Sequence, residues 1–246
     1  MKKRLLVLGL AFTMLAATAC GTSSDGGNKT SKADKTVTAT SNSDKTSETQ
    51  KDDDKKDDAK ESYKSADDIT MDDLKNHEET PAEDFKYRDK SNGEAVIKEY
   101  IGDDQIVVIP NEIDGKKVVD FGKIFTNNKD IVAVRVGDNV ENIKEGAFGN
   151  CDNLKYIILG KNVKVFEHGN VGGKKFEQLE LNDGLEQLGE EGTSGAVIIL
   201  NKDKVEVKIP ESVNHMAFTG AKTLIVKAGS YAESYAKENN MDYIEE

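Results

Sequence analysis

Tryptophan is absent from the sequence, proline occurs three times, and large apolar side chains are scarce between residues 22 and 84. Hydrophobic residues make up 36% of the 246 residues, whereas a globular domain of this size usually contains roughly half. Residues from Phe85 onward carry nearly all of the large apolar side chains. We therefore expect one folded domain of about 160 residues behind a solvated segment.

Positive charge is also in short supply, and the formal net charge is −12. Neutralising phosphates needs clustered lysine and arginine, so this balance argues against a nucleic-acid partner. The three histidines, His77, His168 and His215, are far apart and belong to no metal-ligand motif. Stacked repeats could bring His168 and His215 together, but we expect no metal site and no cofactor.

Motifs of catalysis are missing as well. The stretch 192–195 lacks the spacing of a nucleophile elbow, and 169–174 lacks the glycine spacing and the Ser/Thr of a phosphate-binding loop. Cys151 has no matched histidine in the sequence. Because no acid and base pair is visible, the sequence predicts a protein that is not an enzyme.

The N-terminus has the pattern of an export signal. Three basic residues precede an uncharged apolar run, Leu5 to Ala19, which is short for a membrane span. The run ends in Ala17-Thr18-Ala19-Cys20, which resembles the lipobox of bacterial lipoproteins, although Ala17 stands where leucine is usual. The resemblance implies a signal peptide at 1–19 and diacylation of Cys20, for example by palmitate, on the extracellular face of a bacterial membrane. An ordinary signal peptide cut near Ala19 is the alternative.

Residues 20–84 have the composition of a lipidated, low-complexity tether. Ser, Thr, Asp, Lys and Gly dominate it, and such a segment buries too little apolar area to offset chain entropy, so we expect disorder. The mixed run 51–61 could be read as a metal site, but alternating carboxylates and lysines favour a solvated polyampholyte. A weak helical pattern with Thr70 as N-cap precedes Pro81. A coil of this length spans on the order of 40 Å.

A repeat governs the rest of the chain. Shifting the sequence by 23 residues places Ile131 on Leu154 and Val134 on Ile157. Each unit begins with a short apolar-x-x-apolar-x-apolar strand, whose apolar residues point inward when neighbouring units stack in parallel. Phe125 and Phe148 recur at one point of the unit and are expected to fill the core. Asn128 and Cys151 recur at the following bend, where their side chains can bond to backbone.

Several parts of the chain fit the repeat less well. We expect a hairpin between Ala95–Tyr100 and Ile106–Ile109, with a turn at 102–104. Asn170 and Val171 replace the expected Ala-Phe, and residues 192–204 resemble an insertion with its own strand at 196–200. The run 224–226 is the last expected strand. A helix from the N-cap Ser230 to Asn239 would then close the core.

These motifs together resemble the BspA-type leucine-rich repeats of bacterial surface proteins. The matching pieces are IPNEIDGKKVVDFG, NIKEGAFGNCDNLKYIILGKNVKVF, IPESVNHMAF and KAGSYAESYAKENNMDYI. The resemblance implies an α/β fold over 85–246, a right-handed leucine-rich repeat solenoid of short parallel strands with a C-terminal capping helix. It also implies a place on the cell surface, where some members of the family are adhesins that bind host proteins.

The outward positions of the strands form the candidate binding face. Tyr156 beside Arg135 matches a common recipe for a protein contact, although isolated exposed apolar groups are ordinary. The predicted face comprises Val132, Arg135, Lys155, Tyr156, Ile158, Glu177 and Glu180. We expect a monomeric binding or adhesion protein, with the membrane and a host matrix or envelope protein as partners. The alternative is a scaffold lipoprotein that binds the cell's own wall or secreted proteins.

Overall fold

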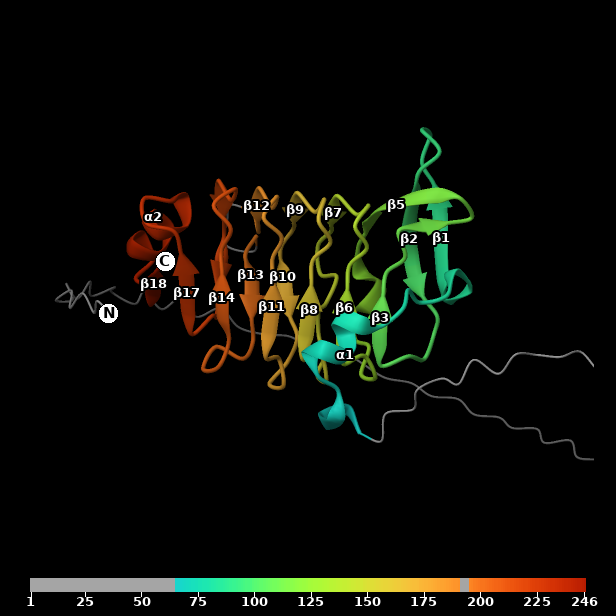
Figure 1. Ribbon diagram of the computed structural model, residues 1–246, viewed down its shortest axis with the longest axis horizontal. Coiled ribbons are helices and arrows are strands. Elements are labelled where there is room, and N and C mark those ends of the chain that lie inside the picture. The colour runs from blue at the N-terminus through green and yellow to red at the C-terminus, as the bar shows by residue number, and fades with distance from the viewer. Residues whose placement is uncertain (1–64, 191–194) are drawn as a thin grey trace, which may run out of the picture. The chain divides into compact units, whose positions relative to one another are not determined.

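The computed structural model describes residues 65–190 and 195–246, which all belong to one compact unit. The predicted signal peptide, Cys20 and the tether up to residue 64 lie outside the described residues. The strands of the unit are stacked along one axis as successive turns of a parallel coil, with α2 near one end and β1 and β2 at the other (Figure 1).

Four sheets form the walls of the coil. The first contains β1 (Phe85–Asp89), β2 (Ala95–Tyr100), β5 (Lys116–Phe121), β7 (Asn142–Ile143), β9 (Val165–Phe166), β12 (Gln187–Leu188) and β15 (His215–Met216), with β4 (Glu112–Ile113) paired to β5. The second contains β3 (Ile106–Val108), β6 (Ala133–Arg135), β8 (Tyr156–Ile158) and β11 (Gln178–Glu180). The third contains β10 (Gly169–Val171), β13 (Val197–Ile199) and β16 (Phe218–Thr219), and the fourth contains β14 (Glu206–Lys208), β17 (Thr223–Val226) and β18 (Tyr243–Glu245).

Helices are few and short in the described residues. The α-helices are α1 (Met71–Asn76) and α2 (Tyr231–Glu238), and the 3-10 helices are η1 (Ala66–Asp68), η2 (Ala82–Asp84) and η3 (Lys123–Phe125).

The repeat predicted from the sequence is the stacking unit of the coil. In the second sheet Val134 pairs with Ile157, and Ile157 pairs with Leu179, both in parallel register. All three side chains are buried in the main core. The inward direction of the apolar-x-x-apolar-x-apolar pattern is therefore confirmed.

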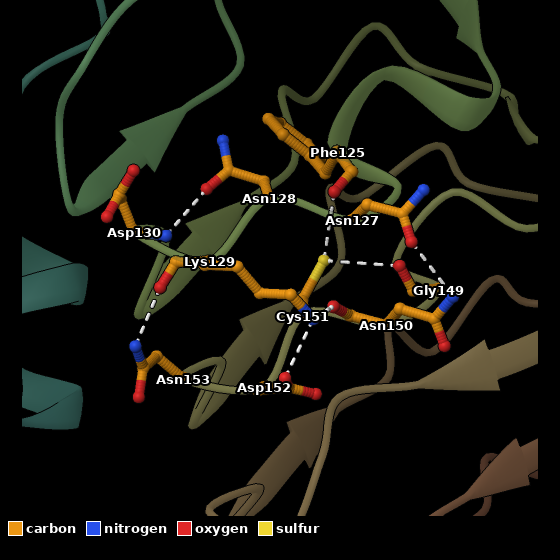
Figure 2. Close-up of polar contacts among 10 residues, drawn as sticks. All are labelled: Phe125, Asn127, Asn128, Lys129, Asp130, Gly149, Asn150, Cys151, Asp152 and Asn153. Atoms are coloured by element: carbon orange, nitrogen blue, oxygen red, sulfur yellow. Dashed lines mark hydrogen bonds and ion pairs between the residues drawn. The ribbon is translucent and has the colours of Figure 1, made fainter.

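The bends of the coil also follow the prediction (Figure 2). Phe125 and Phe148 are buried and stack with ring centroids 5.9 Å apart. The Cys151 thiol donates to the carbonyl of Phe125 at 3.0 Å. The Asn128 side chain accepts the N–H of Ile131 at 3.0 Å. These contacts satisfy backbone groups that the tight bend leaves without a ladder partner.

A third wall begins at β10. The irregularity expected around residues 170 and 192–204 was wrong, because this wall is regular. β10, β13 and β16 form a parallel ladder, so the strand expected at 196–200 is a regular member of the coil instead of an insertion. Val171 and Phe218 are buried in the core there. They take the place that Phe125 and Phe148 fill in earlier turns.

The expected hairpin between Ala95–Tyr100 and Ile106–Ile109 was wrong. β2 pairs antiparallel with β1 and parallel with β5, while β3 belongs to a different wall. The residues between β2 and β3 form a corner of the coil, where the Tyr100 hydroxyl accepts the N–H of Asp104 at 3.0 Å. Both strands carry buried apolar residues because both line the same core from different sides.

The capping helix is confirmed with one correction. Ser230 accepts the N–H of Glu233 at 3.2 Å, and Ala232 and Ala236 are buried against the core. The hydroxyl of Tyr235 bonds to the backbone of Phe218, which ties α2 to the third wall. The run 224–226 is not the last strand, because β18 follows the helix and pairs in parallel with β17.

Residues 65–84 were expected to belong to the disordered tether, and in the structure they fold. η1, α1 and η2 lie here, and Ile69 and Leu74 are fully buried. The Thr70 N-cap is confirmed, and the helix ends at Asn76, before Pro81. The folded part therefore begins before Phe85, because this segment finds apolar partners on the second sheet.

Candidate binding face

The outward side of β3, β6 and β8 is apolar, which is unusual for a wall whose other side already faces the core. Its apolar residues are Ile106, Val132, Ala133, Tyr156 and Ile158. They form a cluster of their own, separate from the main core of the coil. A surface of this kind needs a cover, because burial of its apolar area is favourable.

The cover is residues 65–80, which we call the strap. In Figure 1 α1 lies in front of β6 and β8. Thr70 and Asp73 form a reciprocal capping box: the threonine hydroxyl accepts the N–H of Asp73 at 3.2 Å, and the aspartate accepts the N–H of Thr70 at 2.7 Å. This local pairing starts a helix of only six residues.

Apolar contact holds the strap to the face. Ile69 and Leu74 have 0% exposed surface, and Ala66 and Met71 pack at the edge of the same cluster. A six-residue helix is far too short to be stable in isolation. The strap therefore owes its conformation to the face beneath it.

Two cations of the face bind the main chain of the strap. The Lys155 ammonium donates to the carbonyls of Ile69 at 2.9 Å and of Asp67 at 3.5 Å. It also lies 5.0 Å from the centre of the Tyr156 ring. The guanidinium of Arg135 donates to the carbonyl of His77. Lys155 is only 6% exposed, so these acceptors compensate the loss of water around its charge.

The two ends of the strap are tied by polar contacts. At one end Asp67 lies 3.4 Å from the ammonium of Lys175. At the other end Thr80 and Val108 exchange hydrogen bonds: the Thr80 N–H donates to the Val108 carbonyl at 3.0 Å, and the Thr80 hydroxyl accepts the Val108 N–H at 2.9 Å. Between them Lys75 forms an ion pair with Glu180 at 2.8 Å.

Tyr156 lies at the centre of this contact. Its ring is 8% exposed, and its hydroxyl donates to Glu177 at 2.8 Å. Burial, followed by the Glu177 hydrogen bond, raises the pKa of Tyr156 to about 12. The phenol is therefore neutral and a hydrogen-bond donor at physiological pH.

The predicted binding residues differ in how far the strap covers them. Val132, Lys155 and Tyr156 are buried beneath the strap, so their expected exposure was wrong. Arg135, Ile158 and Glu180 are half-buried, and Glu177 is exposed. That these residues bind a partner stays a prediction. The sequence held one signal for the cover, since the capped helix beginning after Thr70 carries Leu74 and follows Ile69.

Part of the wall remains open. β11 and β14 are the edge strands of two different sheets, so the hydrogen-bonded ladder of this wall stops between them. A groove of about 630 Å³ runs there, with Glu177 and Glu180 on one side and Lys204, Glu206 and Lys208 on the other. The apolar side chains of its floor and rim include Leu179, Leu181, Pro210 and Ile225. Such a mixed and open groove suits a protein surface better than a small molecule, whose pockets enclose most of the ligand.

A second hollow of about 260 Å³ lies beside the C-terminal end of the strap. Glu79, Arg135, Asp138 and Lys161 line it. Lys161 pairs with Asp138 at 2.6 Å, and Glu79 accepts the backbone N–H of Asn111 at 3.2 Å. Because all four charged groups are paired with one another, with the backbone or with the strap, this hollow offers little free charge to a ligand.

The described residues contain no group of three His, Cys, Asp or Glu side chains placed to hold a metal ion. His168 follows β9, and its imidazole nitrogens lie 3.8 Å from a carboxylate oxygen of Glu145 and 3.3 Å from one of Glu190. His215 is on β15, and β12 lies between β9 and β15. Stacking therefore does not pair the two histidines. Burial raises the pKa of the Cys151 thiol to about 11, which keeps it protonated and a poor nucleophile.

Over the same described ranges, no helix combines the length and the apolar character that crossing a bilayer requires.

Comparison with known proteins shows the fold. No protein-family model and no curated protein matches the chain. Among solved structures, a leucine-rich repeat protein of Treponema pallidum is 24% identical, with a TM-score of 0.50, and the match covers 60% of this chain and 71% of that one. A leucine-rich repeat protein of Bacteroides capillosus is 19% identical over 59% of this chain and 95% of its own length, with a TM-score of 0.38. A leucine-rich cell surface protein of Faecalibacterium prausnitzii is 17% identical over 60% of this chain and 44% of its own, with a TM-score of 0.37.

The Treponema match confirms the leucine-rich repeat solenoid expected from the sequence.

Proposed function

Starting from a leucine-rich repeat solenoid, we propose that the chain is a membrane-anchored extracellular protein that binds other proteins and performs no catalysis. Repeat solenoids present long walls on which a partner can be held at many points. One observation carries the proposal: the wall of β3, β6, β8 and β11 ends in the open groove beside β14, where apolar and charged side chains alternate. Glu177 and Glu180, two residues of the predicted face, line this groove.

The anchor rests on the N-terminal sequence. Cys20 follows three small residues at the end of an apolar run and is followed by a polar segment. Two acyl chains hold a protein durably on a bilayer, whereas one chain does so only marginally. Cells fed labelled palmitate should label the wild-type chain, and Cys20→Ser should lose the label and the membrane association. Release of an unlabelled wild-type chain into the medium would contradict the anchor.

The binding role is tested with the soluble chain that begins at residue 21. The chain is immobilised and offered purified host matrix proteins in one arm and solubilised envelope proteins of its own cell in the other. We expect one arm to yield a partner whose capture falls at least about tenfold with Glu177→Lys or Lys208→Glu, because a reversed charge in the groove opposes complementary contacts.

Lys129→Glu is the matched control, since Lys129 is an exposed lysine that pairs with Asp152 at a bend of the coil and does not line the groove. Capture that is insensitive to both groove variants would contradict the proposed site. The arm that yields the partner separates adhesion to a host from the alternative, a scaffold lipoprotein that organises the cell's own envelope.

A further inference from the structure

The strap is held in the way that a peptide ligand is held. We infer that the outward face of β3, β6 and β8 is a binding surface for an acidic amphipathic peptide segment, and that the strap is its internal occupant. The inference deepens the proposed function and rests on it, since it names the chemistry of a partner for the same wall. Its test below uses a defined peptide and does not depend on finding the natural partner.

The contact between the strap and the face is independent of the main core. Ile69 and Leu74 belong to the satellite cluster and not to the main core of the coil. The ladders of these strands join β3 to β6 and β6 to β8 and include no residue of the strap. Removal of the strap would therefore expose the face without opening the core.

The polar groups of the face bind the main chain of the strap. Lys155 and Arg135 donate to main-chain carbonyls of the strap and not to its side chains. Carbonyls are present in any peptide, so these two cations can hold a different sequence in the same place. The side chains that the face selects are those of Ile69 and Leu74, which are fully buried.

The strap is acidic, and the face beneath it carries positive charge. The strap carries Asp67, Asp68, Asp72 and Asp73 within seven positions. Lys175 pairs with the Asp67 carboxylate, and the positive charges of Lys155 and Arg135, although bonded to the main chain, favour an occupant of negative charge. An occupant from another molecule should therefore combine acidic residues with two apolar side chains five positions apart, the spacing of Ile69 and Leu74.

The strap competes with any external segment for the face, and it has an advantage because it is part of the same chain. The strap continues into η2 and β1 within a few residues, so its effective concentration at the face is on the order of millimolar. An external segment must displace it, and its apparent affinity is lowered by the fraction of time that the face is covered. We expect the intact chain to bind such a segment roughly 10- to 100-fold more weakly than a chain whose strap is released.

The experiment uses the chain from residue 21 and a fluorescein-labelled synthetic peptide of residues 65–80. The strap-released variant carries Ile69→Ser and Leu74→Ser, which remove its two buried anchors. Fluorescence anisotropy should show that the peptide binds this variant at least about tenfold more tightly than it binds the wild-type chain. A matched peptide carrying the same two serines should not bind either protein.

A third protein tests whether the peptide binds at the face itself. Val132→Asp in the strap-released background places a charge in the centre of the face and should abolish peptide binding, while circular dichroism shows an intact coil. The inference is overturned if the peptide does not bind the folded strap-released variant, or if it binds the wild-type chain equally well. Failure of the envelope and matrix captures would instead count against the proposed function, because the peptide experiment uses neither.

Discussion

Tyr156 illustrates how one residue can serve two surfaces. Its ring separates the strap from β8, and its hydroxyl reaches Glu177 at the edge of the open groove. Tyr156→Ala should lower the free energy of unfolding by about 3 kcal/mol, since it removes a large buried ring from the cluster. Tyr156→Phe keeps the ring and should cost about 1 kcal/mol. Urea denaturation of the two variants measures the difference, and equal stabilities of Tyr156→Ala and the wild type would contradict the buried position.

The same residue predicts a response to alkaline pH. The pKa of Tyr156 is raised to about 12 in the folded chain, from about 10 in an unfolded chain. The folded state thus holds the phenolic proton more tightly, so this contribution to stability is complete below about pH 10 and is lost as pH rises through 12. The difference in absorbance at 295 nm between wild type and Tyr156→Phe should show one phenol ionising near 12. Ionisation near 10 would mean that the strap does not cover the ring.

At the scale of the element, turns that follow strands of the second sheet are tightly constrained. A Cβ added to Gly160 would lie 2.2 Å from the carbonyl oxygen of Gly137 in the turn before it. Gly160→Ala should therefore destabilise the coil by about 3 kcal/mol, because the backbones of two turns must move apart. Gly184→Ala is the control, since its nearest neighbour would lie at 3.4 Å and at the end of a side chain. Thermal unfolding compares them, and similar melting temperatures would argue against close stacking of these turns.

The elements also show what the sequence could and could not predict. The inward strand positions and the Phe125 stack were predictable because they follow a pattern repeated at a constant spacing, and the Ser230 cap was predictable because an N-cap is a local signal. The strap was missed as a cover, because its partners on β6 and β8 are about 60 to 85 positions away and its own composition is polar. The third wall was missed because Asn170 and Val171 break the local motif while Val171 still fills the core.

At the scale of the whole molecule, the joint between the turns of β11 and β14 lacks the second-sheet ladder that links the earlier turns of the coil. The β12–β15 and β13–β16 ladders cross it, but β11 and β14 are not hydrogen-bonded. Stability in a solenoid is approximately a sum of terms between neighbouring turns. Amides of β14, β17 and β18 should therefore exchange hydrogen at a lower opening free energy than those of β6 and β8. Native-state hydrogen exchange tests this, and one uniform opening energy along the coil would contradict it.

Along the chain, the strap connects the residues that precede Ser65 to the coil. A mechanical load applied from that side, while a partner holds the coil, reaches the contacts of Ile69 and Leu74 before it reaches any ladder of strands. Those contacts form a small satellite cluster, so the strap would peel away at a lower force than the turns of the coil would unfold. Tension along the chain would thus expose the outward face of β6 and β8 while the strands stay folded. Exposure of that face would therefore depend on the force applied to the chain.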